Sequence, residues 1–134
     1  MFSGCYCLKH IYGLDNFNTT NCTNFSSIFY DCFNLQELNL ANWNTAKVTN
    51  LAAIFRNCRS IKDLSFVKNW NTDKVTTLSE TFSGCYSIEE LDLHNWNVNL
   101  VRNVYYTFNY CLSLKQLNIT GWYIHDVTEI RYCF

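Results

Sequence analysis

The residues of this chain with the greatest potential for chemistry are its eight cysteines, five of which are almost evenly spaced. The spaced cysteines are Cys5, Cys32, Cys58, Cys85 and Cys111, at intervals of 27, 26, 27 and 26 residues. Cysteines in such numbers can form a disulfide framework or a metal site. Side chains at one phase of a repeat run parallel, which disfavours a bond between them. We therefore expect these five to be small buried residues with free thiols.

A metal site would have to combine cysteine with histidine. Cys5, Cys7 and His10 lie close together in the sequence, but a fourth ligand is missing and the spacing fits no common zinc pattern. The other histidines, His94 and His125, occupy different phases of the repeat, so stacking would not bring the three together. We expect no metal and no other cofactor.

Carboxylates are the remaining candidates for catalysis. Five of them gather in the apolar segments that follow the cysteines: Glu37, Asp63, Glu89, Glu90 and Asp92. Two such groups could act as the acid and base of a glycosidase, but a solvated acidic strip on an exposed sheet face is the simpler interpretation. The chain has no nucleophile elbow around a serine and no glycine-rich phosphate loop. The sequence thus predicts a protein that is not an enzyme and has no small-molecule substrate.

The elements that position these side chains repeat with the period of the cysteines. The aromatic residues mark two further phases: Trp43, Trp70, Trp96 and Trp122, and Phe29, Phe55, Phe82, Phe108 and Phe134. The common unit is C-x-x-[LI]-x-x-L-x-L-x-N-W-N-T-x-x-V-T-x-L-x-x-x-F. It divides one domain, 1–134, into units at about 5–31, 32–57, 58–84, 85–110 and 111–134.

The alternation between 26 and 27 residues has a local origin. Cys32 and Trp43 are 11 residues apart, whereas Cys58 and Trp70 are 12 apart. The extra residue falls near Val67 in the third unit and near Leu14 in the first. Since every other phase is unaffected, we expect both insertions to lie in turns.

Two periodicities within each unit predict its secondary structure. Apolar and polar residues alternate in 38–40 and 91–93, which is typical of a strand. Apolar residues four apart in 51–55 and 78–82 indicate a helical turn. We therefore predict an α/β solenoid, a leucine-rich-repeat-like right-handed stack of five rungs, each with a short parallel strand and a helical turn.

Asparagines flank the tryptophans. Asn44, Asn71 and Asn97 each follow a tryptophan directly. A buried amide must be hydrogen-bonded, and asparagine can also satisfy the backbone of a turn. We interpret these three residues, like the cysteines and tryptophans, as structural ladders rather than ligands.

A binding surface would lie on the polar side of the predicted strands, because repeat proteins bind partners across a repeated face. The candidate residues are Glu37, Asn39, Asp63, Ser65, Glu90, Asp92, His94, Gln116, Asn118 and Thr120. Ordinary polar surface explains the same residues equally well.

Composition excludes other partners. The net charge is −1 and the ten basic residues are scattered, which argues against nucleic acid and anionic membranes. No segment approaches the roughly 18 apolar residues of a membrane span. The first five residues lack the basic and apolar regions of a signal peptide.

Several tracts resemble known repeats. The pattern L-x-x-L-x-L-x-x-W in 35–43, 88–96 and 114–122 resembles the leucine-rich-repeat core. The fuller pattern in 69–85 and 87–111 is similar to the repeats of BspA-like bacterial surface proteins. That resemblance implies a cell-surface or extracellular protein that mediates protein–protein interaction or adhesion, with no catalytic residue to carry over.

The first and last units carry apolar side chains with no predicted cap. The candidate end contacts are Leu8, Ile11, Phe17, Phe25, Trp122, Val127, Ile130 and Phe134. Ends of matching phase can join head to tail into a filament, so that the chain would be a self-assembling structural subunit. Alternatively, the chain is a fragment of a longer array, and the sequence leaves both interpretations open.

Overall fold

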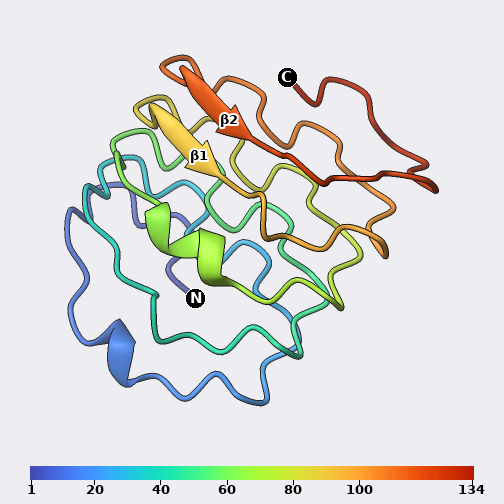
Figure 1. Ribbon diagram of the computed structural model, residues 1–134. Helices are drawn as coiled ribbons and strands as arrows, with labels where there is room; N and C mark the ends of the chain where they lie inside the picture. The colour runs from blue at the N-terminus through green and yellow to red at the C-terminus, as the bar shows by residue number, and fades with distance from the viewer.

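The computed structural model describes all residues, 1–134, and contains little regular secondary structure. Its elements are the 3₁₀ helices η1 (Leu14–Asn16) and η2 (Ser65–Asn69) and the strands β1 (Glu90–Asp92) and β2 (Gln116–Asn118). β1 and β2 form a two-stranded parallel sheet in which Leu91 is level with Leu117. The chain winds in successive passes from its N-terminal to its C-terminal end (Figure 1).

The predicted α/β solenoid is wrong, because the chain has no α-helix and only these two short strands. The segments predicted as helical turns break after their second residue. Ala53, Glu80 and Tyr106, at one phase of the repeat, have left-handed φ values of 54°, 58° and 53°. A right-handed helix cannot continue through a left-handed residue. The four-residue spacing of Leu51 and Phe55 therefore reflects a run of turns.

The strand predicted at 91–93 overlaps β1, but the strand predicted at 38–40 is absent, and the alternating length of the units accounts for the difference. The first and third units carry the insertions, and η1 and η2 lie there, which confirms that the extra residues belong to turns. The 3₁₀ backbone departs from the extended path that ladder pairing needs. In the segments that follow the cysteines, the first two units keep one parallel bridge, His10 with Glu37. The fourth and fifth units are adjacent and both lack an insertion, and they alone form a sheet.

Two sets of backbone hydrogen bonds join neighbouring units instead. In the turn segments, the earlier unit donates: the N–H groups of Ala53 and Phe55 bond the carbonyls of Ser79 and Thr81 at 2.8 and 3.1 Å. In the extended segments the later unit donates, as from Thr76 N–H to Thr49 O at 2.9 Å. Parallel bridges at one phase of the repeat join all five units in turn, through Asn24, Asn50, Thr77, Asn103 and Glu129.

Equivalent apolar side chains pack above one another in a single cluster of 30 buried residues. The phenylalanine rings form its clearest column, with centroids 5.6 to 6.0 Å apart and planes within 20° of parallel. The column consists of Phe2, Phe29, Phe55, Phe82, Phe108 and Phe134. These distances lie within the range of favourable offset stacking. The periodic aromatic residues therefore hold successive units in register.

Candidate functional site

The ten residues predicted to form a binding face are all exposed. Six of them lie on or just beyond the strands: Glu90, Asp92, His94, Gln116, Asn118 and Thr120. The others occupy equivalent positions in the second and third units: Glu37, Asn39, Asp63 and Ser65. We call these ten residues the strand-side face.

Four members of this face also shape the backbone. The Oδ1 atoms of Asn39, Asp63 and Asn118 accept the N–H two residues further on, at 3.0, 2.7 and 3.1 Å. Asp92 does the same for His94 at 3.4 Å. These are Asx turns, in which a side chain replaces a backbone acceptor. The turn that leaves each extended segment is thus built from the side chain that precedes it.

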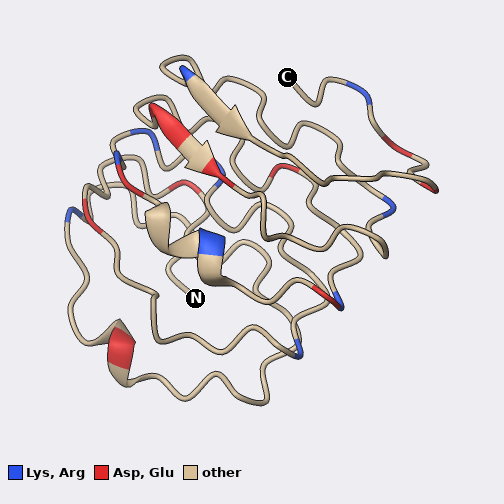
Figure 2. Ribbon diagram, in the orientation of Figure 1, with Lys and Arg blue, Asp and Glu red and all other residues tan.

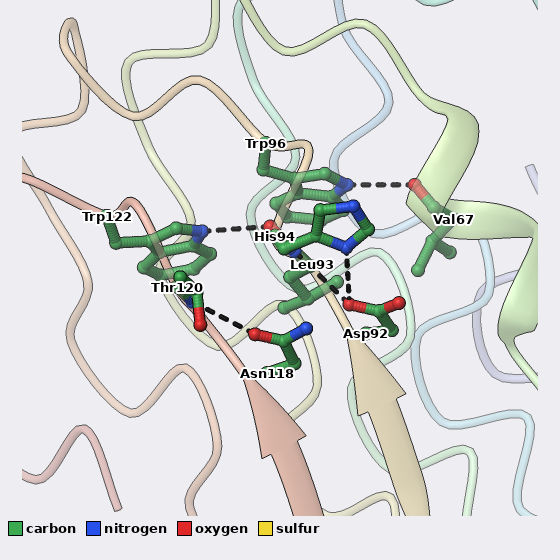
Figure 3. A network of polar contacts seen from close by, with 8 residues as sticks. All are labelled: Val67, Asp92, Leu93, His94, Trp96, Asn118, Thr120 and Trp122. Carbon is green, nitrogen blue, oxygen red and sulfur yellow. Dashed lines mark hydrogen bonds and ion pairs between the residues drawn. The ribbon is translucent and has the colours of Figure 1, made fainter.

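Asp92 and His94 form the closest charged contact of the face (Figure 3). His94 Nδ1 lies 2.7 Å from Asp92 Oδ1, with both side chains about half exposed. The hydrogen bond from His94 lowers the pKa of the Asp92 carboxyl, because it favours the ionised form. A side-chain hydrogen bond from Asn118 makes a smaller contribution in the same direction, and no hydroxyl or thiol nucleophile hydrogen-bonds this pair, so the contact fixes the turn rather than forming a triad.

Three of the four tryptophans that follow these turns donate hydrogen bonds to the backbone of the preceding unit. The indole Nε1 of Trp96 donates to Val67 O at 2.8 Å, and that of Trp122 donates to Leu93 O at 3.0 Å (Figure 3). Trp43 bonds Leu14 O in the same way, at 2.9 Å. The Nε1 of Trp70 is buried without a partner. The tryptophan column therefore binds the backbone of the preceding unit at three of its four positions.

Two adjoining hollows flank the strand-side face. They have volumes of about 620 and 520 Å³ and share Lys62 and Ser87. Glu37 and Asp63 line the first hollow, and Glu89 and Glu90 line the second. Lys115 Nζ bonds Glu89 at 2.7 Å, which lowers the pKa of that carboxyl. The groove is thus acidic, and Figure 2 shows the acidic residues along β1 while Lys and Arg are scattered.

The eight cysteines are free and bind no common centre. Four of the regularly spaced thiols donate to backbone carbonyls of the preceding pass of the chain, at 3.1 to 3.3 Å: Cys32, Cys58, Cys85 and Cys111. Burial raises the pKa of Cys32 to about 11 and that of Cys111 to about 12. Thiols held protonated in this way are poor nucleophiles and poor metal ligands.

The sequence of the chain matches the model of a known protein family. The model described as "Mycoplasma protein of unknown function, DUF285" matches residues 1–65 and 34–134, so its two matches cover the whole chain. The chain belongs to the DUF285 family. No curated protein and no solved structure matched it. None of the helices of this DUF285 protein could cross a membrane, because the longest has five residues.

The asparagines of this DUF285 protein are turn formers on its surface. Asn44, Asn71 and Asn97 are exposed, and each Oδ1 accepts the N–H two residues further on, at 3.0 to 3.1 Å. These bonds satisfy the backbone of the turns, and no hydrogen bond joins one of the three asparagines to another. Asn97 Nδ2 instead bonds Asp73 at 2.9 Å.

The predicted end contacts of the DUF285 chain differ in exposure. Phe17, Ile130 and Phe134 are exposed, at 41, 61 and 76%. Leu8, Ile11, Trp122 and Val127 are half-buried. Phe25 is buried, which corrects its expected exposure, because its ring packs 4.9 Å from that of Trp43.

One surface of this DUF285 protein was not predicted from the sequence. The turn segments bring Arg56, Glu80 and Tyr106 around a single hollow. The signal that could have identified it is the tyrosine content of the last two units, at phases where earlier units have small or polar residues.

Proposed function

We propose that this chain is a non-catalytic binding module of a cell-surface or extracellular protein, and that its strand-side face binds a protein partner. The observation that carries the proposal is the acidic groove, which runs from the second to the fifth unit and is lined by four carboxylates and one cation, Lys62. The similarity to BspA-like surface repeats supports the setting and the adhesive role.

The groove favours a partner with a basic surface. Glu37 and Glu90 are exposed and accept no hydrogen bond from a local turn. Glu37 Oε2 lies 3.6 Å from His10 Nδ1, but its side chain stays 80% exposed, so both carboxylates can still be reached by a partner. The Asx turns of Asp63 and Asp92 fix the backbone beside them. A preordered surface loses little conformational entropy on binding, and opposite charges accelerate association.

Binding kinetics against a panel of purified extracellular proteins test this role. The double variant Glu37→Lys/Glu90→Lys reverses the charge of the groove without touching an Asx turn. Asp15→Lys/Asp126→Lys makes the same change of charge elsewhere on the surface. We expect the first variant to slow association with a basic partner at least tenfold and the second to leave it within twofold. Equal losses in both variants would contradict the proposal, and antibody labelling of intact expressing cells checks the surface location.

Head-to-tail assembly is a second candidate function, favoured by open backbone groups at both edges of the stack. The N–H groups of Ile130 and Tyr132 donate no hydrogen bond, although Val104 and Tyr106, one unit earlier, donate at 2.9 and 3.3 Å. The carbonyls of Asn24 and Ser26 in the first unit accept none. Two donors at one edge thus match two acceptors at the other in number, spacing and phase.

An apolar hollow lies beside those acceptors. Its volume is about 470 Å³, and Phe17, Phe25 and Trp43 contribute to its lining. Ile130 of a second copy has the phase of Phe25 and would continue its column into this space. A further repeat unit of a longer chain would fit the same edges as well as a second copy would. The assembly state of this chain in solution distinguishes the two.

Negative-stain microscopy and sedimentation over a range of concentrations measure that state. We expect filaments that shorten on dilution, and we expect Ile130→Lys to abolish them because it places a charge against apolar side chains. Leu100→Lys, which places a charge at an exposed apolar residue of the fourth unit, away from both edges, should leave assembly intact. A monomer at high concentration would remove this candidate and leave the binding role untouched.

A further inference from the structure

The strongest unassigned feature is a tyrosine-lined hollow formed by the turn segments of the last four units. Its volume is about 530 Å³, within the range of roughly 300–1,000 Å³ that is usual for ligand sites. Nine residues line it: Arg56, Asn57, Glu80, Ser83, Tyr86, Tyr106, Asn109, Tyr110 and Tyr132. None of them belongs to the strand-side face.

Two of the aromatic rings hold each other in place, and the lining remains accessible. The rings of Tyr106 and Tyr132 stack at 5.1 Å and 12°, and Tyr105 packs edge-on against Tyr106 at 4.1 Å. Tyr132 is nevertheless 62% exposed and Tyr110 61% exposed. The hollow thus has flat aromatic surfaces that face solvent, and stacking restricts the Tyr106–Tyr132 pair.

The backbone at these tyrosines indicates that their side chains are needed there. Tyr110 has a φ of 56°, in the left-handed region that bulky residues avoid. Earlier units place residues at this phase that tolerate the conformation: Gly4, Asp31, Asn57 and Gly84. Strained residues of this kind concentrate at functional sites. Tyrosine at position 110 is therefore better explained by its side chain than by its fit to the turn.

The charged side chains that line the hollow have no net charge, and several of its polar groups have hydrogen-bonding positions that no other residue occupies. Arg56 Nη1 bonds Glu80 Oε2 at 2.7 Å, so the two charges offset each other. The second carboxylate oxygen of Glu80, the hydroxyl of Ser83 and the amide of Asn109 make no hydrogen bond within the chain. Asn57 uses its Nδ2 on Asp31 and keeps its Oδ1 free.

We propose that this hollow binds a neutral oligosaccharide. The apolar C–H face of a pyranose ring matches an exposed tyrosine ring, and vicinal hydroxyl groups match an amide, a carboxylate oxygen and a guanidinium. An anionic ligand would gain little, because Glu80 neutralises the only cation that lines the hollow. A proline-rich peptide would use the rings but would leave the ion pair and the amides without partners.

A printed array of neutral and sialylated oligosaccharides, probed with the fluorescently labelled chain, tests this assignment. We expect retention on neutral glycans. Tyr110→Asn and Tyr132→Ala should each lower the signal at least tenfold. Tyr110→Asn places a residue compatible with left-handed backbone at a strained position, so its melting temperature should not fall, and lost binding would then reflect the lost ring. Tyr123→Ala, an equally exposed tyrosine outside the hollow, should bind like the unmodified chain.

Three results would overturn the assignment. These are retention of no glycan, retention of sialylated glycans alone, and neutral-glycan binding that survives both tyrosine substitutions. Binding to a parallel array of proline-rich peptides in place of sugars would also overturn it. Because the hollow and the strand-side face share no residue, Glu37→Lys/Glu90→Lys should bind glycans normally, and failure here leaves the proposed protein-binding role standing.

Discussion

Asn57 occupies the space that a side chain at Gly84 would need. A Cβ at position 84 would lie 3.2 Å from the Cα of Asn57 and closer still to its Oδ1, while Asn57 N–H bonds Ser83 O at 2.7 Å. Gly84 also has a left-handed φ of 73°. The contact shows how closely the turn segments of adjacent units approach one another.

We predict that Gly84→Ala destabilises the chain through both effects. Left-handed backbone costs an alanine about 1 kcal/mol, and displacing Asn57 should bring the total loss to roughly 2–4 kcal/mol. Gly121→Ala is the matched control, because its φ is 86° but no atom lies within 4 Å. Urea unfolding should rank the two variants in this order, and equal losses would show that the steric contact is unimportant.

The tryptophan column supports a differential prediction. Trp96→Phe should lose the indole hydrogen bond to Val67 O, which would keep only its bond from Trp70 N–H, and should cost about 2–3 kcal/mol including lost packing. Trp70→Phe removes an Nε1 that has no partner, so its cost should be smaller by about 1 kcal/mol. Denaturant midpoints of the two variants measure the difference. A larger loss for Trp70→Phe would show that its indole is hydrogen-bonded in solution.

The thiols should react in two classes. Cys7 is exposed. Burial raises the pKa values of the Cys58 and Cys85 thiols well above the usual range for cysteine. At pH 8 those two are protonated and inaccessible, so a chromogenic disulfide reagent should label Cys7 within minutes and leave them intact until denaturant is added. Cys7→Ser should remove the fastest phase, and the four half-buried thiols should react more slowly than Cys7. Rapid labelling of Cys85 in the native chain would contradict the buried arrangement.

Acid should weaken the turn at Asp92. The folded chain lowers the pKa of this carboxyl, so its contribution is fully present above the unfolded pKa of about 4 and is lost as the pH falls through the lower folded value. Carbon-detected NMR titration should place the Asp92 midpoint below that of a free aspartate. His94→Ala should return it toward the ordinary value, and no change on that substitution would show that His94 is not the cause.

The repeat and its phases could be predicted from the sequence, but the backbone conformation within each repeat could not. The phases of the phenylalanine, tryptophan and cysteine columns could be predicted, because only a recurring spacing lets equivalent side chains pack together. The insertions near Leu14 and Val67 were predicted for the same reason, since an extra residue that disturbs no column must lie in a turn. The exposure of the strand-side face followed from simple alternation.

The sequence by itself therefore determined the number of units, their register and which side chains meet between them. Only the tertiary structure decided that the segment after Leu51 is a run of turns, because left-handed residues are stabilised there by hydrogen bonds to the next unit rather than by their own propensity. It also decided that β1 and β2 form a sheet while the equivalent segments of the earlier units keep at most a single bridge, since a continuous ladder requires two neighbours without an insertion. The tyrosine-lined hollow likewise depends on contacts between units, which no single repeat encodes.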